Sequence, residues 1–124
     1  MAEKAENTNS KHYDLEERTE KFAKNVAIFC KNLPKFSSNV IYSNQVIRSS
    51  GSVAANYIEA NEALSRKDFI MRIKICRKEA KESGLWLRLI IGTNGENIRK
   101  EGETLLKEAV ELKKILSSIL EKSR

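Results

Sequence analysis

The segment from Ser65 to Ile91 constrains the fold most, because its apolar residues recur at alternating spacings of four and three. This spacing returns side chains to one face of an α-helix, so the segment predicts one long helix with a continuous apolar seam. The seam consists of Phe69, Ile73, Cys76, Ala80, Ser83, Leu87 and Ile90. A second apolar strip on another side of the helix contains Met71, Ile75, Trp86 and Leu89. One seam is explained by the core of the domain, and the second strip predicts contact with a partner subunit.

Three further segments carry helical spacing, at about residues 14–33, 39–63 and 96–124. Asp14 is the expected N-cap of the first helix, and Pro34 ends it, because proline disfavours a helical conformation at the preceding residue. A Ser or Asn after Pro34 is expected to cap the second helix, whose expected seam is Val40, Ile47, Gly51, Ala54, Ile58 and Asn61. A break at Gly51 remains an alternative, since glycine costs about 1 kcal/mol relative to alanine inside a helix. Ser65 is the expected N-cap of the third helix.

Four helices joined by short loops predict an all-α fold, an antiparallel up-and-down four-helix bundle with shallow crossing angles. A chain of 124 residues is long enough for one domain, expected at residues 13–124, after a flexible N-terminal segment at residues 1–12. Cys30 and Cys76 lie on predicted apolar faces and are expected to be buried, reduced thiols. No apolar run is long enough to span a membrane, and the first residues do not resemble a signal peptide, so we expect a cytoplasmic protein with no membrane partner.

The net charge of +6 comes almost entirely from the predicted third helix, because residues 65–91 include eight bases and only three acids. Seven of these bases fall on one side or its shoulder and are the candidate nucleic-acid-binding residues: Arg66, Lys67, Lys74, Arg77, Lys78, Lys81 and Arg88. Lysine and arginine concentrated on one face predict a phosphate-binding surface. The alternative is a solvated helix face whose bases pair with acids of the flanking helices.

This sequence lacks the residue patterns that are typical of catalytic and metal-binding sites. The single histidine, His12, lies in the expected N-terminal segment, and Glu-x-x-His pairs, zinc-ligand spacings and a phosphate-binding glycine loop are absent. We therefore expect a protein that is not an enzyme and needs no cofactor or metal. Trp86 and Tyr57 could stack on a base, but large aromatic residues at helical spacing are more typical of a core or an interface.

The block RSSGSVAANYIEA from Arg48 to Ala60 and the segment from Ser65 to Leu89 resemble the four-helix-bundle proteins encoded in bacterial 23S rRNA intervening sequences. Gly84 and Leu85 stand where that family pattern has Arg and Tyr. The resemblance implies a left-handed bundle that assembles as a homopentamer and has a suspected role in nucleic-acid binding. It extends to the accessory proteins of diversity-generating retroelements, which work with a reverse transcriptase. It implies no catalytic residues.

These observations predict an oligomeric bundle that binds RNA or DNA through phosphates without reading bases. The strip Met71, Ile75, Trp86 and Leu89 is the candidate oligomer interface, because it is poor in charge and contains an aromatic anchor. Two alternatives remain, a scaffold that binds only proteins and an accessory subunit of a reverse transcriptase. Binding to phosphate is expected to weaken steeply as the salt concentration rises, which separates it from a scaffold role.

Overall fold

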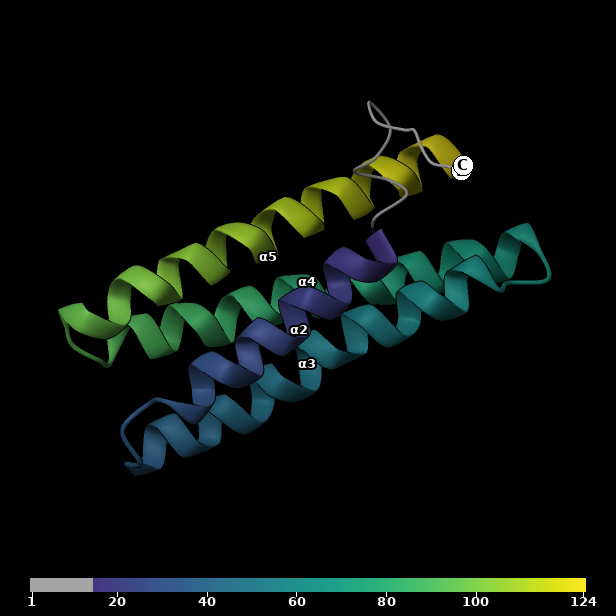
Figure 1. Ribbon diagram of the computed structural model, residues 1–124. Coiled ribbons are helices and arrows are strands. Elements are labelled where there is room, and N and C mark those ends of the chain that lie inside the picture. Colours follow the sequence, from purple (N-terminus) through teal and green to yellow (C-terminus); the bar gives the residue numbers. More distant parts are fainter. Residues whose placement is uncertain (1–14) are drawn as a thin grey trace.

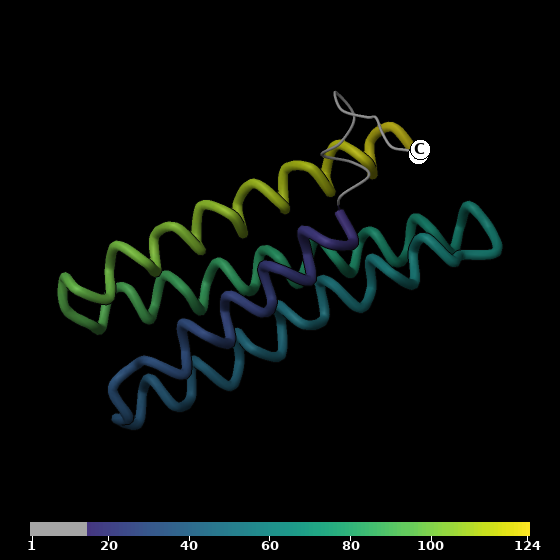
Figure 2. Tube along the Cα trace, viewed as in Figure 1, coloured from purple at the N-terminus to yellow at the C-terminus, as the bar shows by residue number. Residues whose placement is uncertain are grey.

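The computed structural model describes residues 15–124, and this part of the chain forms four α-helices and no β-strand. The helices are α2 (Leu15–Lys31), α3 (Ser37–Asn61), α4 (Arg66–Gly92) and α5 (Glu96–Ser123). Consecutive helices run in alternating directions, and short loops join them at the two ends of the molecule (Figures 1 and 2). The all-α class and the four-helix architecture are confirmed, whereas the handedness and the oligomeric state stay predictions. The predicted flexible segment and the Asp14 cap lie outside the described residues.

The core is one apolar cluster to which all four helices contribute. α3 packs between α2 and α4, α4 packs between α3 and α5, and α2 closes the bundle against α5. Arg18 of α2 and Glu108 of α5 join across this last contact through two hydrogen bonds of 2.7 and 2.9 Å. The largest fully buried side chains include Phe22, Phe29, Ile73, Leu87, Leu112 and Leu116. The predicted seam of the third helix therefore faces the core, although Phe69 is only partly buried.

The predicted seam of α3 was wrong, because this helix turns a different face toward the core. Its buried residues are Asn39, Val46, Ser49, Ser50, Val53, Tyr57 and Ala60. Val40, Ile47 and Ile58 are between 42% and 46% exposed. Serine can occupy the core because its hydroxyl is satisfied there: the Oγ atoms of Ser49 and Ser83 are 2.7 Å apart, and Ser83 donates to the carbonyl of Glu79. Small side chains thus face the neighbouring helices, and the larger aliphatic ones remain outside.

Two glycines in the helices have opposite surroundings. α3 is continuous through Gly51, where an added β-carbon would meet no atom within 4 Å. At Gly102 of α5, an added β-carbon would lie 2.7 Å from Cγ1 of Ile91 and 3.4 Å from Cζ of Phe29. Gly102 therefore permits the close approach of α5 to α4 and α2, whereas Gly51 has no such role within the subunit.

We expect Gly102→Ala to destabilise the protein and Gly51→Ala to stabilise it. Overpacking of a tight core site costs about 1–3 kcal/mol, whereas alanine in an open helix position gains about 0.5–1 kcal/mol over glycine. Denaturant unfolding of both variants, followed by circular dichroism, measures the two free-energy changes. Equal effects of the two substitutions would contradict the packing described for Gly102.

Of the two capping predictions for α4 and α3, the first is confirmed and the second is wrong. Ser65 caps α4, and its hydroxyl accepts a hydrogen bond of 3.0 Å from the amide of Asp68, as predicted. The expected Ser or Asn cap of α3 was wrong, because Phe36 occupies the N-cap position and provides no side-chain hydrogen bond. The side chain of Asn39 is engaged elsewhere, in a reciprocal amide pair with Asn94 at 3.0 and 2.8 Å. This pair ties the first turn of α3 to the turn between α4 and α5.

The two cysteines are buried free thiols, as predicted. Burial raises the pKa of Cys76 to about 12, and its thiol donates to the carbonyl of Val53. Cys30 is buried as well, and desolvation raises its pKa. Neither thiol is therefore a reactive thiolate at neutral pH. Within residues 15–124, no group of His, Cys, Asp and Glu is arranged to hold a metal ion, and none of the helices has the length and apolarity needed to cross a membrane.

Candidate nucleic-acid interface and subunit interface

Six bases of α4 form a line along its outer surface, which we call the basic stripe. The stripe consists of Lys67, Lys74, Arg77, Lys78, Lys81 and Arg88, of which all but the partly buried Arg77 are exposed. With a rise of 1.5 Å per residue, the stripe from Lys67 to Arg88 is about 32 Å long. The opposite face of α4 is fixed in the core by Ile73, Leu87 and Ile90. The packing of the bundle thus holds these charges on a straight, rigid support.

The acids of α4 do not neutralise the stripe. Within residues 15–124, ion pairs join Arg18 to Glu108, Arg48 to Glu79 and Glu82, and Arg99 to Glu96. None of these pairs involves a stripe residue, because Glu79 and Glu82 point toward Arg48 of α3. The alternative of a helix face paired by flanking acids is therefore not realised in the described part of the chain.

Arg66, the seventh predicted base, has a different position. Its Nε donates to the main-chain carbonyl of Ser123 at 2.8 Å, and its Nη2 donates to the same oxygen. Arg66 thus ties the first residue of α4 to the last residue of α5. Two of its donors are already engaged, so we do not include it in the stripe.

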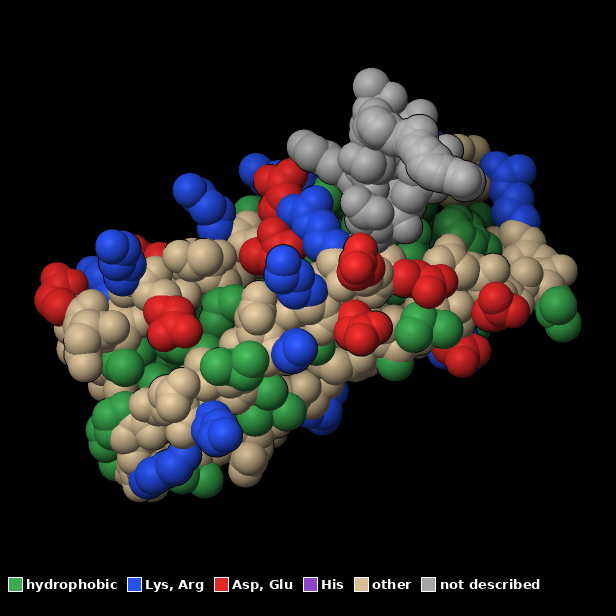
Figure 3. All heavy atoms as spheres, in the orientation of Figure 1, with side chains coloured by type: hydrophobic (Ala, Val, Ile, Leu, Met, Phe, Trp, Pro, Cys, Tyr) green, Lys and Arg blue, Asp and Glu red, His purple; other side chains and the backbone are tan. Residues whose placement is uncertain are grey.

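The face of the molecule that presents α2 has a different charge pattern. Lysine and arginine side chains are interspersed there with aspartate and glutamate (Figure 3). In the sequence of α2, Glu16, Glu17 and Glu20 alternate with bases such as Lys21 and Lys24. This face therefore carries no uniform excess of positive charge and serves as a reference for the stripe.

The predicted interface residues of α4 divide into two kinds. Met71 is 48% exposed, and Ile75 and Leu89 are partly buried. Trp86 instead packs against the core of its own subunit and stacks on Tyr42 of α3, with ring centroids 6.1 Å apart. Next to Tyr42, Ile41 is 57% exposed. The sequence prediction did not include Ile41, because it drew its interface candidates from the third helix alone.

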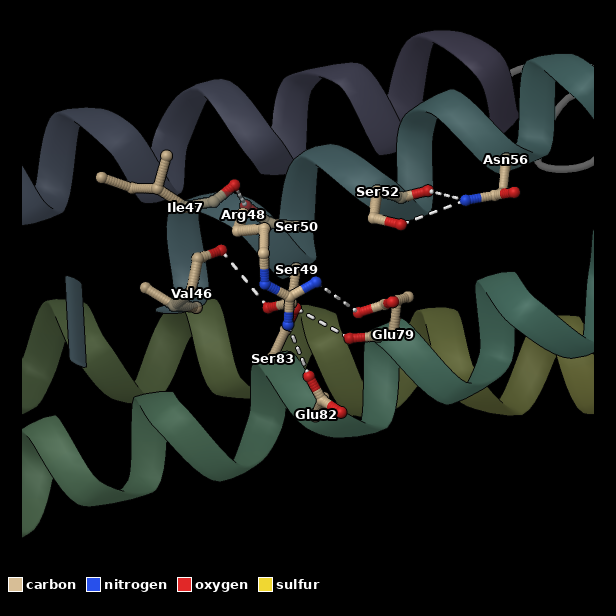
Figure 4. A network of polar contacts seen from close by, with 10 residues as sticks. All are labelled: Val46, Ile47, Arg48, Ser49, Ser50, Ser52, Asn56, Glu79, Glu82 and Ser83. Atoms are coloured by element: carbon tan, nitrogen blue, oxygen red, sulfur yellow. Dashed lines mark hydrogen bonds and ion pairs between the residues drawn. The ribbon is translucent and has the colours of Figure 1, made fainter. Parts of the chain in front are cut away.

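A network of polar side chains joins α3 to α4 (Figure 4). Nη2 of Arg48 lies 2.7 Å from Oε1 of Glu82, and its Nη1 lies 3.5 Å from Oε1 of Glu79. Glu79 is only 8% exposed, and its Oε1 has no hydrogen-bond partner in the structure. Nε1 of Trp86 is likewise buried without an acceptor. Leaving a buried donor unsatisfied costs about 1–3 kcal/mol, so Trp86 gives this side of α4 an unused donor, whereas Oε1 of Glu79 is compensated by its ion pair with Arg48.

Comparisons with known proteins identify relatives of this fold. Residues 11–118 match the model of a family described as 23S rRNA-intervening sequence protein. A crystal structure from Bacteroides thetaiotaomicron VPI-5482, described as a protein with unknown function from the S23 ribosomal protein family, is 36% identical with a TM-score of 0.73. The similarity covers 85% of this chain and 96% of that one. No match was found among curated proteins.

Proposed function

The chain belongs to the family of 23S rRNA-intervening sequence proteins, and on this premise we propose that it is a non-enzymatic protein that binds RNA or DNA through phosphate groups. The observation that carries this proposal is the basic stripe, whose six bases form no ion pair with another described residue. The similar protein from Bacteroides thetaiotaomicron is itself of unknown function, so the proposal depends on the charges of this chain.

A row of fixed positive charges favours phosphate for a simple physical reason. Each phosphate that a lysine or arginine neutralises releases a condensed counterion, and this release drives binding at low salt. The stripe offers charges but no convergent hydrogen-bonding groups of the kind that read base edges. Binding is therefore expected to depend strongly on salt and weakly on sequence.

We also propose that subunits of this protein associate, as the homopentamer implied by the resemblance requires. Two observations support the α3–α4 surface as the interface. Ile41 and Met71 expose about half of their apolar side chains there. Nε1 of Trp86 is a buried donor without an acceptor in the subunit, and a neighbouring subunit could supply one. Repetition of the stripe in an assembly would add phosphate contacts by multivalency.

A binding assay with labelled RNA hairpin and labelled DNA duplex tests the proposed function. Six phosphate contacts predict a loss of affinity of roughly 10³-fold between about 50 and 200 mM salt. Light scattering on the same samples should give particle masses that are multiples of the 14.1 kDa subunit. Failure to bind either nucleic acid at low salt would contradict the proposal, and an assembled particle with that behaviour would favour a protein-interaction scaffold.

A further inference from the structure

We infer that the basic stripe selects double-helical nucleic acid over single strands and contacts it through the backbone alone. This inference rests on the proposed function and adds the class of ligand to it. Three features of the structure support it: the surroundings of the stripe, its charge spacing, and the position of α4 between two other helices.

Within residues 15–124, the stripe has no aromatic surface beside it on which a base could stack. The phenylalanine, tyrosine and tryptophan residues within the described part of the chain are Phe22, Phe29, Phe36, Tyr42, Tyr57, Phe69 and Trp86. Of these only Phe36 is exposed, and it is the N-cap residue of α3 and does not belong to α4; the others are buried, packed against the core, or stacked on one another. Proteins that bind single strands without sequence preference combine a basic groove with such aromatic platforms.

Aliphatic residues occupy the places beside the stripe where aromatic platforms would be useful. At its N-terminal end, the stripe borders a groove of about 800 Å³ lined by Ile70 and Met71 together with Lys67 and Lys74. Farther along α4, Leu85 is 39% exposed and follows Lys81 by one helical turn. A single strand on this surface would gain phosphate contacts but no stacking.

Charge density also favours a duplex. Double-stranded DNA carries one negative charge per about 1.7 Å, so about 19 phosphates lie along the roughly 32 Å of the stripe. One strand with a spacing of about 3.4 Å offers about half as many. The stripe is also nearly as long as one helical turn of DNA, about 34–36 Å. A rigid row of charges therefore lies in a stronger negative potential beside a duplex, which is itself already ordered.

The position of α4 in the bundle excludes deep entry into a groove. An isolated helix of about 10–12 Å diameter fits the major groove of B-DNA, which is about 12 Å wide. α4 is packed on one side against α3 and on the other against α5. Only its outer surface can approach the ligand, so the stripe reaches backbone phosphates and leaves base edges unread. B-form DNA and A-form RNA duplexes satisfy this requirement equally.

Competition binding with the full chain tests the inference. A 20-base-pair RNA duplex and a 20-base-pair DNA duplex are compared, at low salt, with unstructured 40-nucleotide single strands that carry the same number of phosphates. We expect both duplexes to bind at least tenfold more tightly than the single strands. Equal or tighter binding of single strands would overturn the inference but leave the proposed function intact, whereas no binding of any of them would reject the proposed function itself.

A gain of function provides a second test. Leu85→Tyr adds an exposed aromatic ring beside Lys81, and Ile28→Tyr adds one on α2, which does not contact α4 and where Ile28 is 46% exposed. We expect Leu85→Tyr to strengthen single-strand binding about fivefold or more through stacking, with duplex binding unchanged, and Ile28→Tyr to change neither. Unaltered single-strand binding by Leu85→Tyr would show that a missing aromatic surface does not set the preference, and would contradict the inference.

Discussion

Replacing Lys74 and Lys78 together with glutamate is expected to lower the affinity for an RNA hairpin at least tenfold at low salt. Both side chains are exposed in the middle of the stripe and form no ion pair with another described residue. The double variant removes two favourable phosphate contacts and adds two negative charges beside the remaining bases. Fluorescence anisotropy at several salt concentrations measures both the affinity and its salt dependence. The milder pair Lys74→Gln and Lys78→Gln should reduce the slope of log K against log salt by about 2.

The matched control places the same change of charge on α2. Lys21→Glu with Lys24→Glu alters two exposed lysines on a face of mixed charge, as Figure 3 shows for the α2 side. If only net charge mattered, both double variants would lose affinity equally, and the assignment of the stripe would be refuted. If the stripe is the contact surface, the α2 variant retains most of its affinity. Thermal unfolding of both variants verifies that the bundle remains folded.

Introducing glutamate at Ile41 and Met71 is expected to separate the subunits. Each side chain is about half exposed in the isolated subunit, so the substitutions leave its core almost untouched. In an assembly, the two carboxylates would be desolvated against apolar neighbours, which is costly for unpaired charges. Light scattering should then report a mass near 14.1 kDa, the mass of one chain, with unchanged helix content. Trp86→Glu is a less selective probe, because Trp86 also packs against Tyr42 and the core.

Leu64→Glu provides the comparison for this variant. Leu64 is 99% exposed at the connection between α3 and α4, outside the proposed interface, so we expect the variant to keep the mass of the unmodified protein. An unchanged mass of the Ile41→Glu, Met71→Glu variant would remove the α3–α4 surface as the interface. If this variant lost helix content and its particle mass did not change, Ile41 and Met71 would be needed for the fold of the subunit itself.

Much of the fold can be predicted because three helices have an apolar face that stands out from the rest of the helix. In α5, for example, Leu105, Leu112 and Leu116 recur at helical spacing and all are buried. α3 offers two candidate faces, one with Val40, Ile47 and Ile58 and another with serines among its apolar residues. Hydrophobicity favours the first face, but packing selects the second, because buried hydroxyls can pair with each other and with main-chain carbonyls. Such pairing depends on the partner helix and leaves no periodic signal in the sequence.

The candidate site is predictable to a similar degree. Helical geometry alone places Lys74, Lys78 and Lys81 on one side of α4. It does not reveal whether acids nearby neutralise them. That depends on Arg48, which lies 31 residues before Glu79 in the sequence and pairs with it and with Glu82. The structural use of Arg66 at the end of α5 could not be predicted either, because it is a contact between distant parts of the chain.

Substitutions have different consequences on the buried and the exposed face of α3. The side chains of Ser49 and Val53 are completely buried, so substitutions to larger residues there compromise every copy of the folded subunit. Val40, Ile47 and Ile58 are largely dispensable for the subunit alone, since each exposes more than 40% of its surface. Mutations on this outer face can therefore accumulate in a lineage without loss of the fold. If distant homologues keep aliphatic residues at these positions, selection has maintained contacts between molecules. If they carry polar residues there, those contacts have been lost.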